Sequence, residues 1–206
     1  MLKTARPAAR ACGAGLAGLT LIELLVTLTM LALMLIFAVP ALSDWLASTH
    51  VRGVAEQLEG SLRLAQAEAI RRNRQAVLVL TAQTPSLSAA PSDSAPYWLV
   101  RSLPLLGGEV ATDLDFIQDG PAARSVGVNI SGPALLCFNS LGRQVSNNAT
   151  GLGSDCHASS QSDVPLTYLL SAPAASRRWQ VQVYLGGRIR LCDPSQTLSD
   201  SSPEGC

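Results

Sequence analysis

The chain has 206 residues, 48% of them hydrophobic and 15% charged, and its 15 basic residues balance its 15 acidic ones. This length and composition exclude a fully disordered chain and leave room for one domain with an appendage. A net charge of zero excludes a global basic field, so binding of nucleic acid or anionic lipid would need a local patch. The charges are unevenly placed, because residues 1–18 carry three bases and no acid, whereas residues 19–206 carry 12 arginines and 15 acids.

Residues 1–18 form a basic segment rich in Ala, Gly and Pro, and an apolar run from Leu19 to Leu42 follows. As a helix, this run would span about 36 Å, which is enough to cross a bilayer. An ordinary secretory signal is cut after its apolar stretch, whereas here the small residue Gly18 precedes the run. Cleavage after Gly18 would leave the apolar helix on the mature protein. A plain signal anchor, or a signal peptide cut near Ala41, is the alternative.

One acidic residue, Glu23, interrupts the apolar run. The eleven Leu, Ile, Val and Phe residues between Leu24 and Leu42 favour insertion strongly enough to offset about 3 kcal/mol for one ionised group. Cleavage after Gly18 would create an α-amino group at Leu19 that can neutralise a carboxylate. In a helical assembly, Glu23 of one subunit would meet the terminus of its neighbour and fix the axial register.

The segment GLTLIELLVTLTMLALMLIFAVPAL resembles the leader and helix of type IV pilins and type II secretion pseudopilins. The resemblance implies prepilin-peptidase cleavage between Gly18 and Leu19, methylation of Leu19, an assembly role for Glu23 and a kink at Pro40, where proline removes a backbone donor. Leu19 departs from the phenylalanine usual at the first mature position. The implied location is the inner membrane, with a single pass and a periplasmic head, and the pilus after assembly. The implied partners are prepilin peptidase, the inner membrane and other pilins that contact the N-terminal helix.

Residues 43–74 continue the helix with an amphipathic pattern. Its apolar stripe has alternating spacings of three and four, and oppositely charged i,i+4 pairs lie between its members, which are Val51, Ala55, Leu58, Leu62, Ala65 and Ala69. Such a narrow stripe suits packing along a sheet. Arg71, Arg72 and Arg74 end the helix, where cations favour the negative end of its dipole, and a ligand site is the alternative for this cluster. The segment AQAEAIRRNRQAVLVL also resembles the helix-to-strand junction of the GspH/FimT branch of pilin-like proteins.

Residues 75–206 carry short β patterns separated by turn-forming residues, at 76–80, 97–103, 126–130, 133–139, 164–170, 179–185 and 188–192. They predict an antiparallel β head. The fold class is therefore α+β, with a long N-terminal pilin helix, transmembrane in its first half and amphipathic in its second, packed on the head. Polar stretches at 84–96 and 146–163 are expected to be loops. Asp113, Asp115 and Asp119 do not have calcium-loop spacing and are expected to be solvated loop acids.

Cys12 lies in the leader and would be lost with it. The mature chain would keep four cysteines, which are Cys137, Cys156, Cys192 and Cys206. Three connectivities are possible. Nearest-neighbour pairing, which closes loops of 19 and 14 residues, is favoured, and each bond would be worth about 3 kcal/mol. Complete pairing would place the head outside the cytoplasm. A zinc site that includes His157 is the alternative, although no pair has the short C-x-x-C spacing of a structural zinc site.

The sequence has no G-x-S-x-G, Walker A or H-E-x-x-H motif, and its one G-x-G-x-x-G string, GAGLAG at residues 13–18, lies in the expected leader and follows no predicted strand. Its two histidines, His50 and His157, fall in the predicted helix and in a polar loop. We therefore expect that the protein is not an enzyme and that it uses no catalytic residue, metal or cofactor.

The segment WQVQVYLGGRIRLC predicts a β hairpin. A two-residue turn at Gly186 and Gly187 would mix arginines into the apolar face. A three-residue loop with a left-handed glycine instead pairs Val183 with Ile189, Tyr184 with Arg188 and Gln182 with Arg190, and apolar matching favours it. In that register Arg188 and Arg190 face solvent beside Tyr184, Gln182 and Arg178.

The segment GGRIRLCDP resembles the G-R-x-R motif of FimT-type minor pilins, with Gly187, Arg188 and Arg190 at the motif positions. The resemblance implies non-specific binding of double-stranded DNA for uptake in natural transformation. Guanidinium groups grip phosphate oxygens without base preference. Because the patch is small and the mature chain acidic, we expect weak binding per subunit, strengthened by several subunits. The alternatives are a purely architectural minor pilin, on which these arginines are a solvated strand face, and a GspH-like pseudopilin of a type II secretion system.

Overall fold

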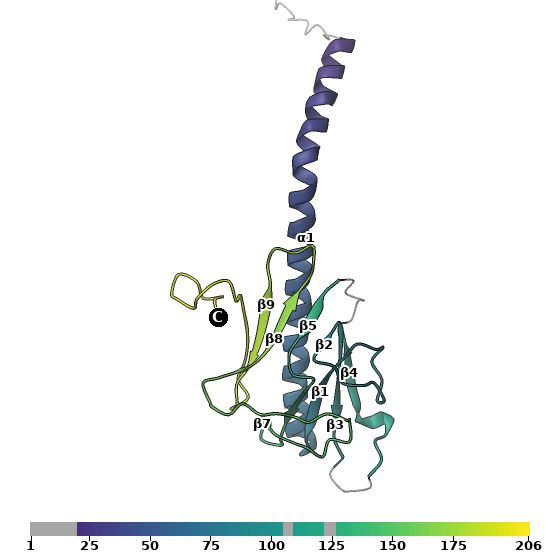
Figure 1. Cartoon of the computed structure of the whole chain (residues 1–206), viewed down its shortest axis with the longest axis vertical. Helices are drawn as coiled ribbons and strands as arrows, with labels where there is room; N and C mark the ends of the chain where they lie inside the picture. Colours follow the sequence, from purple (N-terminus) through teal and green to yellow (C-terminus); the bar gives the residue numbers. More distant parts are fainter. Residues whose placement is uncertain (1–19, 105–108, 122–126) are drawn as a thin grey trace, which may run out of the picture. The chain divides into compact units, whose positions relative to one another are not determined.

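The computed structural model describes residues 20–104, 109–121 and 127–206. The expected leader and its cleavage site, Gly18 and Leu19, lie outside the described residues. The chain divides into two compact units, Met1–Ala41 and Leu42–Cys206. A single helix, α1 (Leu21–Arg72), contributes to both units (Figure 1).

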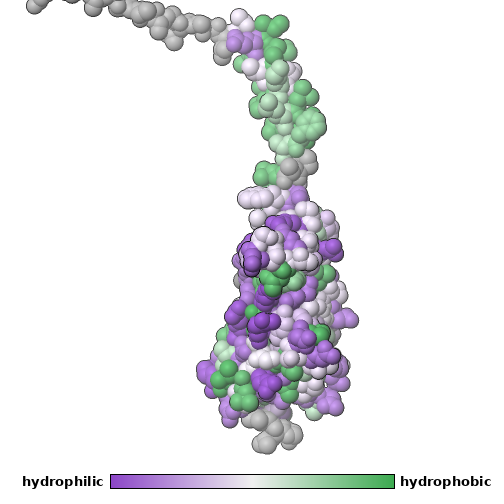
Figure 2. All heavy atoms as spheres, turned by 90° about the vertical axis from the view of Figure 1, so that its left-hand side faces the viewer, coloured by the Kyte–Doolittle hydropathy of each residue, from purple (hydrophilic) through white to green (hydrophobic). Residues whose placement is uncertain are grey.

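In the first unit, α1 begins with a polar cap and continues as an apolar helix. The hydroxyl of Thr20 accepts a hydrogen bond from the backbone N–H of Glu23 at 3.3 Å, as an N-cap residue does. The hydroxyls of Thr27 and Thr29 donate to the carbonyls of Leu24 and Val26, each at 2.9 Å. This part of α1 is exposed, predominantly apolar, and long enough to cross a membrane (Figure 2). The helix continues through position 40, but the Pro40 side chain lies outside the described part, so the kink stays a prediction.

In the second unit, α1 buries the stripe that the sequence spacing predicted. All six residues of that stripe are at most 1% exposed, and they are Val51, Ala55, Leu58, Leu62, Ala65 and Ala69. The helix ends at Arg72, and Asn73 follows with φ of 50°. The N–H groups of Asn73 and Arg74 donate to the carbonyls of Ile70 and Ala69, both at 3.2 Å. The last carbonyls of the helix are thus satisfied by a left-handed cap.

The head contains two five-stranded antiparallel sheets. The first has the order β4 (Phe116–Gly120), β3 (Tyr97–Ser102), β1 (Ala76–Thr81), β6 (Leu135–Phe138) and β7 (Gln144–Val145). The second has the order β10 (Ile189–Cys192), β9 (Trp179–Val183), β8 (Leu166–Ser171), β5 (Asn129–Ser131) and β2 (Ser94–Ala95). A 3-10 turn, η1 (Asp113–Asp115), precedes β4. The expected α+β class is confirmed.

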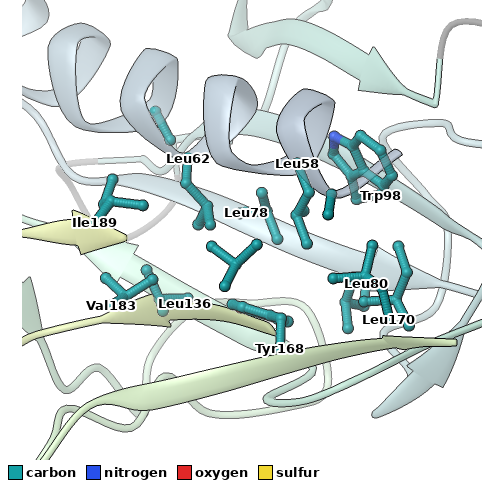
Figure 3. Close-up of a cluster of buried hydrophobic side chains, with 14 of the residues drawn as sticks. Leu58, Leu62, Leu78, Leu80, Trp98, Leu136, Tyr168, Leu170, Val183 and Ile189 are labelled. Carbon is teal, nitrogen blue, oxygen red and sulfur yellow. The ribbon is translucent and has the colours of Figure 1, made fainter. Parts of the chain in front are cut away.

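Two apolar clusters explain why β1 is apolar from Ala76 to Leu80. Leu78 and Leu80 belong to the main core, where they meet Leu58 and Leu62 of α1 (Figure 3). Val77 and Val79 belong to a second cluster, which also contains the disulfide-bonded cysteines of β6 and the neighbouring loop. Because both faces of β1 are buried, every position favours an apolar side chain.

The structure corrects the interpretation of the acidic segment before residue 120. The sequence analysis predicted a loop with solvated acids, whereas residues 116–120 form β4, the edge strand beside β3. Asp115 is 8% exposed, and its carboxylate accepts hydrogen bonds from the Ser102 hydroxyl at 2.6 Å and the Thr112 N–H at 2.8 Å. Burial raises the pKa of Asp115, but these hydrogen bonds and the nearby Arg74 outweigh it and leave the pKa below its usual value.

The arginines at the end of α1 hold the helix to its surroundings. Arg71 and Arg72 both donate to the carboxylate of Glu68, at 2.6 and 2.7 Å. Arg72 also donates to the carbonyl of Leu114 at 2.8 Å, and Arg74 pairs with Glu109. The cluster thus links the helix end to residues 109–115, in addition to its predicted position at the negative end of the helix dipole.

Glu68→Gln is expected to destabilise the head by about 1–2 kcal/mol at neutral pH, a value reduced for solvent screening because the Arg71 side chain is 65% exposed. Hydrogen bonds from Arg71, together with Arg72 and against the effect of burial, lower the pKa of Glu68 from 4.5 to about 2. A carboxylate whose pKa is lower in the folded than in the unfolded chain stabilises the fold fully at any pH above the unfolded pKa. This stabilisation is lost as the pH falls from about 4.5 to about 2. Thermal unfolding across this range measures the effect.

The control is Glu56→Gln, which removes an i,i+4 partner whose side chain is 54% exposed. It should change the free energy of unfolding by less than about 0.5 kcal/mol. Equal losses in the two variants would contradict the role given to Glu68.

Candidate nucleic-acid interface

The C-terminal hairpin has the three-residue register predicted from its apolar residues. Strands β9 and β10 pair Val183 with Ile189 and Gln182 with Arg190. The N–H of Tyr184 donates to the carbonyl of Arg188 at 2.9 Å, and that of Gly187 donates back to Tyr184 at 2.8 Å. Gly187 has φ of +91°, a left-handed conformation that favours glycine.

The turn at residues 185–187 is fixed against α1 and against the turn between β6 and β7. Gln66 of α1 donates through Nε2 to the carbonyls of Gly142 and Gly187, at 2.7 and 3.0 Å. The N–H of Gln144 donates to the carbonyl of Leu185 at 3.1 Å. A Cβ on Gly187 would lie 2.1 Å from the Gly142 oxygen. The main chains of the two turns therefore lie in direct contact, and Gln66 of α1 bridges them.

Arg188 is exposed and held by an aromatic ring. Its guanidinium carbon lies 3.9 Å from the centroid of the Tyr184 ring, and the Tyr184 hydroxyl donates to Gln182 at 3.1 Å. Stacking on a ring orients a guanidinium without using its N–H donors. Arg188 therefore presents hydrogen-bond donors to solvent in an ordered position.

Arg190 differs from the prediction that it faces solvent freely. It is half-buried, and its Nη2 donates to the carbonyls of Gly205 and Pro203, at 2.6 and 3.2 Å. Its strand partner Gln182 is only 9% exposed. The prediction missed these contacts because the favoured Cys192–Cys206 pairing brings the chain end back to β10 but does not indicate that its carbonyls accept hydrogen bonds from Arg190. Arg190 fastens the C-terminal loop, and its part in binding a ligand stays a prediction.

Arg178 is not grouped with Arg188. It precedes β9, whereas Tyr184 follows β9, so the strand separates them by roughly 17 Å. Arg178 instead lines a pocket of about 280 Å³ with Arg177 and Asp193. The buried carboxylate of Asp193 accepts two hydrogen bonds from Ser195 and lies 3.5 Å from Arg177. Burial raises the pKa of Asp193, but these partners outweigh it and lower the pKa.

Two disulfides have the connectivity that the sequence spacing favoured, Cys137–Cys156 and Cys192–Cys206. The second closes a C-terminal loop that we define as residues 193–206. Main-chain bonds hold this loop, including Asp193 N–H to Glu204 at 2.7 Å. Arg52 of α1 donates to Glu204 at 3.3 Å and lies over the Trp179 ring at 4.7 Å. The loop is thus attached at both β10 and α1.

Further arginines, missed by the sequence analysis, come from other elements near the same turn. Arg143 is exposed and follows Gly142, whose carbonyl touches Gly187. Arg63 of α1 donates to the carbonyl of Ile189 at 3.3 Å and pairs with Glu59 at 2.7 Å. No sequence pattern links these positions. We define the hairpin surface as Arg63, Arg143, Tyr184 and Arg188.

Comparisons place the chain among known proteins. The model of the family described as "Type II transport protein GspH" matches residues 54–187. Two crystal structures of the type IV minor pilin FimU from Pseudomonas aeruginosa (strain PAO1), in space groups P65 and P21, are each 15% identical to the chain, with TM-scores of 0.45 and 0.47. The alignments cover 75% and 77% of this chain, and 98% and 96% of the FimU chains. A search of curated proteins finds no match.

Proposed function

We propose, because this chain belongs to the GspH family of minor pilins and pseudopilins, that its head binds double-stranded DNA of any sequence through the hairpin surface. In this proposal the protein is a FimT-like minor pilin that serves DNA uptake, and it binds rather than catalyses. Prepilin peptidase cuts after Gly18, and the apolar part of α1 anchors the chain in the inner membrane. That helix then packs with other pilins in the filament.

The ordered, exposed guanidinium of Arg188 is the observation that carries the DNA-binding proposal. A phosphate group can accept from several of its N–H groups, because none of them donates to another of the described residues. Contacts to phosphate carry no base preference, as a receptor for arbitrary DNA requires. Arg143 and Arg63 add positive charge beside the same turn.

The binding should be weak for one subunit. The chain after Gly18 has a net charge of −3, and the Glu59 carboxylate neutralises Arg63 within the hairpin surface. Two or three phosphate contacts per head give only weak affinity. Tight binding would need several subunits along a filament, or companion pilins, to contact the same DNA.

Arg188→Ala is expected to weaken binding of a random-sequence duplex roughly tenfold at low salt and to reduce the slope of log affinity against log salt by about 1. Fluorescence anisotropy of a labelled duplex, titrated with the full mature chain in detergent micelles, measures both quantities. Arg178→Ala is the matched control, because Arg178 is also an exposed arginine next to β9 but lies at the opposite end of that strand from the hairpin surface. Absent wild-type binding, or equal losses in both variants, would reject the proposal.

A second candidate function, a pseudopilin of a type II secretion system, is favoured by the extent of the family match. The matched region ends at Gly187 and therefore omits Arg188 and Arg190. In this case the partners are other pseudopilins, and the arginines are a solvated strand face. Deletion of the gene distinguishes the two: loss of protein secretion with normal transformation supports the pseudopilin, and the reverse supports the DNA receptor.

A further inference from the structure

The loop between β8 and β9, residues 172–178, is tied to the first turns of α1 in the second unit (Figure 1). The carboxylate of Asp44 accepts hydrogen bonds from the N–H and the hydroxyl of Ser176, at 2.7 and 2.9 Å. Asp44 is two residues past Leu42, where the apolar run ends, which is a helical rise of about 3 Å. Lipid headgroups extend about 5–7 Å beyond the hydrocarbon, so a run that spans the bilayer leaves Asp44, and the loop bonded to it, among headgroups. This step rests on the proposed anchoring of α1.

The β8–β9 loop combines apolar and cationic residues at this level. Its sequence is Ala-Pro-Ala-Ala followed by Ser-Arg-Arg. Residues 173–174 are exposed, and so are Arg177 and Arg178. Trp45 of α1 is 61% exposed, and tryptophan is enriched at membrane–water interfaces because it joins an apolar ring to a polar N–H. Apolar area and cationic side chains together favour contact with a lipid surface.

The acids that face the loop are engaged within the head. Asp44 bonds to the loop itself, and Asp193, which is 1% exposed, lies 3.5 Å from Arg177. The Arg177 side chain nevertheless stays 53% exposed. Among the residues that the structure describes, none forms a hydrogen bond or an ion pair with the Arg178 side chain. Its five N–H donors are therefore available to an acceptor outside the head.

Phosphate is the acceptor that a bilayer supplies at this level. A guanidinium binds two oxygens of one phosphate through parallel N–H bonds. In phosphatidylglycerol no ammonium group competes for that phosphate, whereas phosphatidylcholine carries one. We propose that the β8–β9 loop binds the headgroup phosphate of an anionic phospholipid, through Arg178 and in part through Arg177, and so holds the head on the bilayer before the subunit enters a filament. The hairpin surface lies at the opposite end of β9 and stays open to DNA.

The test follows the arginine Nε–H signals by NMR in the full mature chain, ¹⁵N-labelled at arginine and inserted in phosphatidylcholine nanodiscs. Single Arg→Gln variants assign the signals. Partial replacement of the lipid by phosphatidylglycerol should shift the Arg178 signal saturably, shift that of Arg177 less, and leave that of Arg188 unchanged. Glycerol phosphate in solution, at the same concentration, should have a much smaller effect. An Arg178 signal that ignores phosphatidylglycerol, or that glycerol phosphate shifts equally, would overturn the proposal.

Arg178→Gln should lower the preference of the protein for phosphatidylglycerol over phosphatidylcholine roughly fivefold, the effect of one arginine at a lipid surface. Electron paramagnetic resonance of spin-labelled lipids, with the full chain in vesicles, gives the ratio of the two association constants. Arg143→Gln is the matched control, because Arg143 is also an exposed arginine but lies in the turn between β6 and β7, beside the hairpin surface. Equal effects of the two changes would overturn the proposal.

The outcomes separate this proposal from the proposed function. A chain that does not enter nanodiscs contradicts the anchoring and the lipid contact together. An inserted chain without a preference for phosphatidylglycerol overturns the lipid contact alone. DNA binding is measured in detergent micelles without phospholipid, so its failure is distinct from both.

Discussion

Gly187→Ala is expected to lower the free energy of unfolding of the head by about 3 kcal/mol and to weaken DNA binding. The left-handed conformation costs an alanine about 1–2 kcal/mol, and overlap in a packed site costs about 1–3 kcal/mol more. The overlap is direct, since the new Cβ would lie 2.1 Å from the Gly142 oxygen and 2.4 Å from Nε2 of Gln66. The two turns must then separate, which moves Arg188 relative to Arg143.

Gly186→Ala provides the control, because Gly186 has no atom within 4 Å of its Cβ position and is not among the glycines with positive φ. It should be nearly neutral. Thermal unfolding gives the stability, with about 6–12 °C expected for 3 kcal/mol in a head of this size. DNA anisotropy gives the functional effect. Similar melting temperatures for the two alanine variants would show that the turns are not in close contact.

Replacement of both Cys192 and Cys206 by serine is expected to cost about 3 kcal/mol of stability, because the bond closes a loop of 14 residues. The same change should not reduce DNA binding, and it should raise affinity modestly. Once the C-terminal loop is released, the guanidinium of Arg190 is freed from the carbonyls of Pro203 and Gly205. The two exposed acids of that loop, Asp200 and Glu204, also become mobile, which lessens their repulsion of phosphate.

The other disulfide supplies the comparison. Serine at both Cys137 and Cys156 opens a loop of 19 residues and should cost a similar free energy, but it leaves Arg190 fastened. Its DNA affinity should therefore equal that of the wild type. If loss of the Cys192–Cys206 bond lowered affinity as much as Arg188→Ala does, the ordered C-terminal loop would itself be part of the interface.

Regular patterns made several features predictable from sequence. The three-and-four spacing identified the buried stripe of α1, because that period places side chains on one helix face. Apolar matching selected the hairpin register, since the alternative would have buried arginines. Short separations identified the disulfide pairs. In each case the information lay within about twenty residues of the chain.

Contacts without a local pattern could not be predicted. Gln66 reaches Gly187 across 121 positions, and Arg190 binds carbonyls of a polar chain end that has no periodicity. Strand β4 has the sequence FIQDG, whose polar residues and glycine give no strand signal, and its pairing with β3 determines its structure.

The threonines of the apolar part of α1 have a mechanical consequence for an assembled fibre. Thr27 and Thr29 bond to carbonyls of their own helix, and Thr20 takes up an N–H of the first turn. In hydrocarbon, free groups of this kind would attach one helix to another. With them satisfied internally, the rod offers its neighbours carbon surface and one carboxylate, Glu23. Bending or stretching the fibre would then slide such rods past one another against dispersion forces and one charged contact per subunit, that of Glu23, rather than against a lateral lattice of hydrogen bonds.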